Sequence, residues 1–259
     1  MDIVPINTDN FVDQIICIGQ RGSDRTNRGL RRISNEGLDV HLFDAHMKKN
    51  HRDGCWSSHT HVWQESKQKG CKRILVFEDD VVFIHPFLSN LPYLEYFISS
   101  VNNWSFLFLG CLPLQLERTN FPHISRVQAY DLHAYIINLE HQAVGEMLKL
   151  DPWLFNFFHR PIDVFVSLQA SCYTLTPLIA VQETTFSNEL LFLPPGTCSS
   201  NIYRQICMEN ILTDPYKNHT LAKLTTKLFL HGTQITYYPR LIIFSISMVF
   251  VFLMIMINS

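Results

Sequence analysis

Short apolar runs rich in β-branched residues alternate with helix-like stretches, and this alternation restricts the fold more than any other feature. The runs predicted as strands are 14–18, 39–43, 73–77, 105–109 and 133–138. The stretches predicted as helices are 24–35, 57–69, 86–100 and 139–150. Strands and helices that alternate in this way are typical of a mostly parallel sheet covered by helices. The sequence therefore predicts an α/β fold.

Composition excludes several other classes of protein. The chain has 259 residues, enough to bury a substantial core, and its 10 Gly and 12 Pro exclude a collagen-like chain. A formal net charge of −2 argues against a protein that depends on broad electrostatic attraction to nucleic acid. The 7 Cys lack regular spacing, so a disulfide framework or a structural zinc site is not expected.

The end of the sequence is apolar. Residues 241–257 carry no charge, and as a helix they would span about 25 Å, at the short end of what crosses a bilayer. We expect a C-terminal transmembrane helix there, joined through a wrapping or linker segment at 191–240. The start shows no signal-peptide pattern, and Lys217 and Arg240 precede the apolar segment, so the bulk is expected to face the cytosol. The alternative is a buried core helix or strand.

Three acidic residues follow the apolar strand at 73–77, namely Glu78, Asp79 and Asp80. Ligands of open α/β sheets bind at the carboxyl ends of the strands. Because side chains alternate along a strand, we expect Glu78 and Asp80 on one face and Asp79 on the other. Oxygen ligands at this density suit Mg²⁺ or Mn²⁺ together with a nucleotide diphosphate. The alternative is a solvated acidic turn.

Arginines follow the first predicted strand. Arg21 and Arg25 fall in the loop and at the start of the helix, where a cation that binds phosphate can sit. The alternative is that these side chains coat an exposed helix face.

The helix predicted at 57–69 carries a histidine on a mixed apolar face. Ser57 or Ser58 is the expected N-cap, and His59, Val62 and Trp63 then lie on one face. His59 is either a packed core histidine or a site residue.

Several ordered blocks of the sequence resemble glycosyltransferase family 25, which includes lipopolysaccharide galactosyltransferases and collagen galactosyltransferase domains. Two are close to family motifs: G-C-x-x-S-H-x-x-x-W at 54–63 and L-V-x-E-D-D-V at 75–81. The other blocks are 16–25, 40–45, 106–110, 133–137, 161–165 and 177–187. Together they extend over about residues 13–190.

This resemblance implies a GT-A-type nucleotide-sugar-binding domain at 1–190. It implies a UDP-galactose or UDP-glucose donor, inversion at the anomeric carbon and a glycan or protein acceptor. By the same likeness Glu78 and Asp80 hold Mn²⁺ or Mg²⁺, and Asp79 belongs to the donor-binding element.

The resemblance also suggests roles for residues outside the acidic run. Asp163, the acid of the 161–165 block, is the candidate general base, with a helix cap or a supporting residue as the alternative. Arg21 and Arg25 are candidate contacts to the donor's phosphates or uracil. His59 and His133 are candidate pocket residues.

Two stretches depart from the family pattern. Ile18-Gly19-Gln20 stands where the family has I-N-L, and Asp131-Leu132 stands where it has small residues or Thr. Neither departure touches the acidic run. The leading hypothesis is a metal-dependent glycosyltransferase with a membrane anchor. The alternatives are a binding protein that kept the scaffold without catalysis, and a metal-dependent hydrolase, for which no nucleophile arrangement is visible.

Overall fold

The computed structural model describes residues 11–149 and 162–183. The expected linker at 191–240 and the apolar segment at 241–257 lie outside the described residues. In the part that is described, no helix has both the length and the apolar character needed to cross a membrane.

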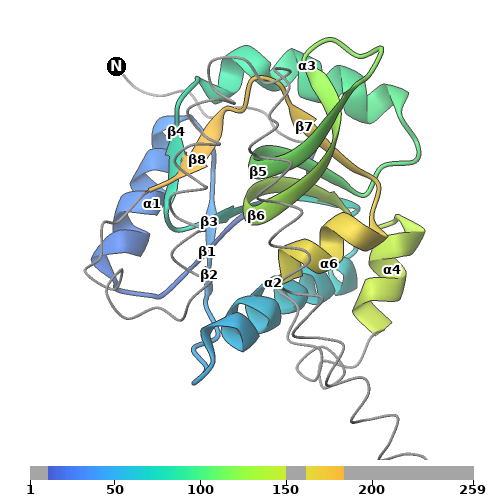
Figure 1. Cartoon of the computed structure of the whole chain (residues 1–259). Coiled ribbons are helices and arrows are strands. Elements are labelled where there is room, and N and C mark those ends of the chain that lie inside the picture. The colour runs from blue at the N-terminus through green and yellow to red at the C-terminus, as the bar shows by residue number, and fades with distance from the viewer. Residues whose placement is uncertain (1–10, 150–161, 184–259) are drawn as a thin grey trace, which may run out of the picture.

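The main sheet contains six strands, and their order is β2-β1-β3-β6-β5-β7 (Figure 1). Their bounds are β1 Gln14–Gly19, β2 His41–Asp44, β3 Arg73–Glu78, β5 Phe106–Arg118, β6 Ile124–Asn138 and β7 Cys172–Leu175. β1 pairs in parallel with β2 and β3, and β5 pairs in parallel with β7. β6 runs antiparallel to β3, β5 and β7. The predicted α/β fold with a mostly parallel sheet is confirmed.

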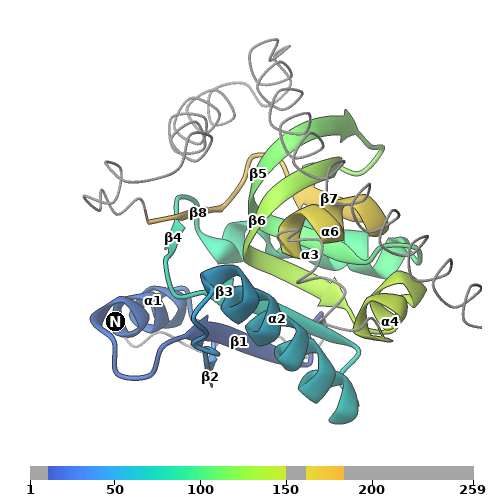
Figure 2. The ribbon, with the colours of Figure 1, turned by 60° about the horizontal axis from the view of Figure 1, so that its bottom comes forward.

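Helices cover both faces of this sheet (Figure 2). They are α1 Asp24–Asn35, α2 His51–Gln68, α3 Phe87–Ser100, α4 Gln142–Lys149 and α6 Ile162–Gln169. Successive residues of β1 belong to two separate hydrophobic cores. Ile16 and Ile18 pack with α2, α4 and α6, whereas Ile15 and Cys17 pack with α1 and α3. The alternation of side chains along each buried strand therefore produces three layers.

The predicted elements agree with the structure except at some ends. α1 has the predicted bounds. α2 begins at His51, with Asp53 in its first turn, where an acidic side chain interacts favourably with the helix dipole. The predicted N-cap is therefore wrong, because Ser57 and Ser58 lie inside the helix. Ser58 Oγ instead donates to the carbonyl of Gly54 at 2.8 Å.

Several elements have no counterpart among the predictions. β4 (Val81–Phe83) and β8 (Ala180–Gln182) pair antiparallel as a small second sheet. β5 and β6 extend well past their predicted ends as a long hairpin whose register shifts at three places in β5. The small sheet brings the end of β8 beside the acidic residues that follow β3.

Candidate functional site

The acidic residues lie at the carboxyl end of β3, as predicted. The strand ends at Glu78, and Asp79 and Asp80 form a turn that leads into β4. Strand alternation therefore does not continue to Asp80. Arg25 joins the two aspartates instead, with its Nε 2.7 Å from Asp79 Oδ1 and its Nη2 2.7 Å from Asp80 Oδ2. Asp79 and Asp80, rather than Glu78 and Asp80, thus share a partner.

The start of α1 fixes this turn against β1. Ser23 caps the helix by accepting from the Thr26 N–H at 3.1 Å, and Thr26 Oγ1 donates to Asp79 Oδ2 at 2.6 Å. A Cβ added to Gly19 would lie 2.8 Å from Asp79 Cβ and 2.7 Å from Thr26 Oγ1. The glycine that departs from the family pattern thus permits the close approach of the turn to α1.

Asp80 is the most buried carboxylate of the turn, with a relative exposure of 8%. Its Oδ1 has no hydrogen-bond partner among the described residues. Burial, together with the negative charge of Glu78, raises the pKa of Asp80 to about 7 against the opposing effect of Arg25. A buried oxygen of this kind fits a hard divalent cation such as Mg²⁺ or Mn²⁺, which would supply the missing partner.

Glu78 contacts different partners from those of Asp79 and Asp80. Its Oε1 lies 3.0 Å from His59 Nε2, and its Oε2 accepts from Gln182 Nε2 at 3.3 Å. Burial alone would raise the pKa of Glu78. The hydrogen bond from His59, together with the nearby Arg25 guanidinium, outweighs burial and lowers the pKa of Glu78 well below its ordinary value. Glu78 is therefore ionised at neutral pH.

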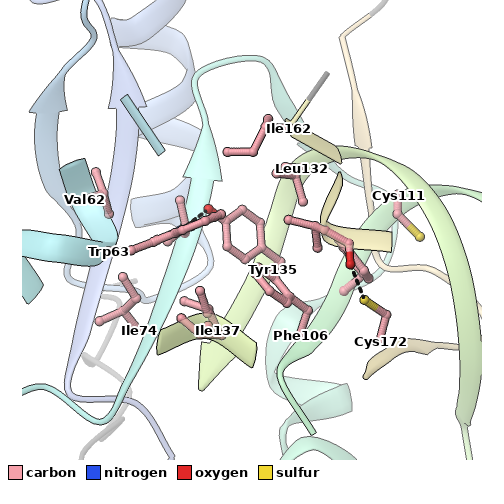
Figure 3. Close-up of a cluster of buried hydrophobic side chains, with 14 of the residues drawn as sticks. Val62, Trp63, Ile74, Phe106, Cys111, Leu132, Tyr135, Ile137, Ile162 and Cys172 are labelled. Carbon is pink, nitrogen blue, oxygen red and sulfur yellow. Dashed lines mark hydrogen bonds between the residues drawn. The ribbon is translucent and has the colours of Figure 1, made fainter. Parts of the chain in front are cut away.

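His59 is buried, as the packed-histidine reading predicted, and it also contacts the site. It lies on the same face of α2 as Trp63. Its Nδ1 is 2.7 Å from the hydroxyl of Tyr135. Trp63 Nε1 donates to the same hydroxyl at 2.9 Å (Figure 3). The two readings of His59 are thus compatible.

Cys55 lies on the same helix, one turn before His59. One donor atom from each of Cys55, His59 and Glu78 lies within 4.8 Å of the others, a geometry that can hold a metal ion. Burial, followed by the charge of Glu78, raises the pKa of the Cys55 thiol far above its usual range. Both ring nitrogens of His59 already have partners. Hard cations therefore fit the oxygens of Glu78 and Asp80 better than this set.

The end of β8 is attached to the acidic turn. The N–H of Glu183 donates to the carbonyl of Asp80 at 2.6 Å. The Glu183 carboxylate lies 3.0 Å from Arg32 Nη1 and 3.7 Å from Arg28 Nη2. Sequence reasoning assigned no role to Gln182 or Glu183, because their pairing with the turn joins positions about a hundred residues apart.

The remaining predicted site residues are spread more widely. Arg21 pairs with Asp44, Nε to Oδ2 at 3.7 Å, and its side chain is 69% exposed. It does not join the acidic turn, whereas Arg25 does. His133 is buried on β6, with Nε2 3.5 Å from the carbonyl of Ala180, and it contributes electrostatically to the lowered pKa of Glu78.

Asp163 lies in the first turn of α6. Its Oδ2 accepts from the N–H of Asp131 at 3.1 Å. Asp131 has a φ of 66°, an uncommon value for a residue other than glycine. Asp163, Asp131 and Glu78 all act electrostatically on Cys55 and raise the pKa of its thiol further.

Part of the chain is similar in sequence to known glycosyltransferases. Residues 50–144, which include α2 and the acidic turn, match the sequence profile of glycosyltransferase family 25 (LPS biosynthesis protein). The predicted resemblance to glycosyltransferase family 25 is confirmed. Human procollagen galactosyltransferase 2 is 24% identical over 85% of this chain and 42% of its own length. The chain thus spans less than half the length of this human relative.

Two further similarities are weaker or shorter. A rat protein named probable inactive glycosyltransferase 25 family member 3 is 40% identical over 22% of this chain and 10% of its own length. A solved structure of a glycosyltransferase involved in glycosylation of the major capsid of PBCV-1 is 11% identical. It covers 55% of this chain and 66% of that chain, with a TM-score of 0.37.

Proposed function

We propose that this protein is a glycosyltransferase that moves a hexose from a UDP-sugar donor to a hydroxyl group of a glycan or protein acceptor. The observation that supports this proposal best is the meeting of Arg25, Asp79, Asp80 and Glu78 at the carboxyl ends of β1 and β3. This arrangement combines a guanidinium with a buried carboxylate oxygen that has no partner among the described residues. A nucleotide diphosphate and a divalent cation use groups of this kind. Galactose is the first sugar to test, because the human relative is named a galactosyltransferase.

Glu78 and Asp80 are the proposed holders of Mn²⁺ or Mg²⁺. The cation supplies positive charge that neutralises the leaving diphosphate. Arg25 orients both aspartates of the turn, and His59 and Gln182 orient Glu78.

Asp163 is the proposed general base. In the proposed reaction the acceptor oxygen forms a bond to the anomeric carbon while the bond from that carbon to the diphosphate oxygen breaks, with inversion. The acceptor proton passes to Asp163. Asp163 and Glu78 both act electrostatically on Cys55, and this proximity to the acidic run supports the assignment.

The experiment is a transfer assay on the purified full chain with UDP-galactose or UDP-glucose, Mn²⁺ and candidate acceptors, read by mass spectrometry. We expect release of UDP and a hexose-mass increase on an acceptor. Asp80→Asn should remove metal-dependent binding of the nucleotide. The exposed Asp39→Asn is the matched control and should bind as the wild type does. If no donor is cleaved or transferred and Asp80→Asn leaves nucleotide affinity unchanged, the proposal fails.

A second candidate is a nucleotide-sugar-binding or glycan-binding protein without catalysis. The similarity to a rat protein that is named probable inactive favours it. Binding of UDP-sugar by the wild type, with no transfer to any acceptor and no effect of Asp163→Asn, would support this second function.

We also propose that residues 241–257 anchor the chain in a membrane, with the rest facing the cytosol. The apolar, uncharged composition of this segment supports the proposal. Membrane association that resists carbonate extraction should be lost when 241–257 is deleted. Association that survives the deletion would contradict it.

A further inference from the structure

Behind Glu78, three buried side chains form a hydrogen-bond chain whose direction follows from their chemistry. The indole Nε1–H of Trp63 can only donate, so the Tyr135 hydroxyl accepts from it at 2.9 Å. The hydroxyl has one proton of its own to donate. His59 Nδ1, at 2.7 Å, is the acceptor that the structure places within range of it. Tyr135 therefore donates to Nδ1.

This direction sets the proton on the histidine ring. A neutral imidazole that accepts at Nδ1 carries its proton on Nε2. His59 Nε2 lies 3.0 Å from Glu78 Oε1 and donates to it. Gln182 donates to the other oxygen of Glu78 at 3.3 Å. Each oxygen of Glu78 therefore accepts one hydrogen bond and keeps a lone pair for a ligand.

Burial makes this direction costly to reverse. Trp63, Tyr135 and His59 are each at most 1% exposed, so water cannot replace a lost partner. Reversal would leave the Tyr135 proton without an acceptor in the interior. The ring of Phe106 packs against the ring of Tyr135, with the two centroids 5.7 Å apart, and restricts movement of the tyrosine (Figure 3).

We infer that Tyr135 is a positioning residue that holds the His59 ring through Nδ1, with the ring proton on Nε2, and thereby orients Glu78 toward the sugar donor. The part that concerns the donor rests on the proposed function. The same assignment excludes His59 as a metal ligand, because each of its ring nitrogens is occupied by a hydrogen bond. Glu78 and Asp80 remain the oxygen ligands.

The first test reads the proton directly, in the absence of donor. The full chain is labelled with ¹⁵N-histidine, and the His59 signals are identified by their loss in His59→Gln. We expect the wild type to carry the ring proton on Nε2 at neutral pH. Tyr135→Phe removes the donor to Nδ1, so we expect the signal of the unprotonated Nδ1 to shift while the proton stays on Nε2 beside the Glu78 carboxylate. A wild-type proton on Nδ1, or no change in Tyr135→Phe, would overturn the inference.

The second test reads the consequence for the donor. Tyr135→Phe should weaken UDP-sugar binding on the order of tenfold and raise the donor KM more than it lowers kcat. In a His59→Gln background the same change should add little, because the histidine it acts through is absent. Tyr173→Phe, in the other core beside Phe97, is the matched control and should leave donor binding unchanged.

These tests separate the two proposals. If the wild type shows the Nε2–H form but binds no UDP-sugar, the proposed function fails while the hydrogen-bond direction stands. If it binds UDP-sugar and Tyr135→Phe binds equally well, the positioning role of Tyr135 fails while the proposed function stands. If Tyr135→Phe does not fold, the wild type alone tests the inference, because a His59 ring proton on Nδ1 would show that Tyr135 accepts from the histidine instead of donating to it.

Discussion

At the scale of single residues, one guanidinium holds the acidic turn together. Arg25 contacts Asp79 and Asp80 through two different nitrogens, a geometry that the fork of arginine allows. We predict that Arg25→Met lowers the free energy of unfolding by about 1 kcal/mol, since the guanidinium is partly exposed and solvent screens the loss. Arg21→Met is the control, because its ion pair with Asp44 is exposed, and should change stability by less than about 0.5 kcal/mol. Denaturant unfolding measures both, and equal effects would contradict the special position of Arg25.

Asp80 gives the second prediction at this scale, which concerns pH. Its pKa of about 7 lies above the ordinary 3.8, so the folded state holds this proton more tightly than the unfolded chain. The resulting stabilisation is complete below about pH 4 and is lost as the pH rises through about 7. In EDTA, the wild type should therefore lose stability relative to Asp80→Asn between pH 5 and 8.

The measurement for Asp80 is denaturant unfolding at several pH values. Asp39→Asn, at an exposed position, is the control and should differ from the wild type by the same amount throughout. A difference between wild type and Asp80→Asn that is flat, or that changes in the opposite direction, would show that burial does not raise this pKa.

At the scale of elements, the site depends on how closely β1 and α1 approach the turn after β3. We predict that Gly19→Ala destabilises the protein by about 1–3 kcal/mol, because the new methyl group would overlap Asp79 Cβ and Thr26 Oγ1. Gly145→Ala in α4 is the control. Its new methyl group would meet only Lys67 Nζ, at 3.8 Å, and alanine favours a helix interior by up to about 1 kcal/mol. Opposite signs of the two changes in denaturant unfolding are expected, and a neutral Gly19→Ala would contradict the close packing.

The same scale shows which elements the sequence could predict. The helix-like polar stretch of α1 and the apolar run of β3 are local signals, and both elements lie where they were predicted. β4 and β8 are three residues each and are stabilised by pairing with each other across about a hundred positions. No local pattern carries that pairing, so the roles of Gln182 and Glu183 were not predictable.

The residues of the candidate site also divide into those that the sequence could predict and those that it could not. Glu78, Asp79 and Asp80 were found because they follow a recognisable strand, and His59 because it shares a helix face with Trp63. Tyr135 belongs to a predicted strand but has no polar pattern around it. Its role depends on the orientation of its hydroxyl between Trp63 and His59, which only the packing of α2 on β6 determines.

At the scale of the whole molecule, a cation and a nucleotide that bind only the folded state must stabilise it. The unpaired oxygen of Asp80 and the carboxylates around it repel one another without a cation, so metal and nucleotide should bind better together than apart. We predict that UDP and Mn²⁺ together raise the melting temperature of the full chain by more than the sum of the increases that UDP alone and Mn²⁺ alone produce. At a concentration one hundred times the Kd, the expected stabilisation is about 2.7 kcal/mol.

EDTA should remove the metal-dependent part of this stabilisation. Asp80→Asn should lack that part, while Asp39→Asn should retain it. A melting temperature that responds to UDP equally with and without Mn²⁺ would show that this site binds nucleotide without a metal, and the proposed roles of Glu78 and Asp80 as metal ligands would then be wrong.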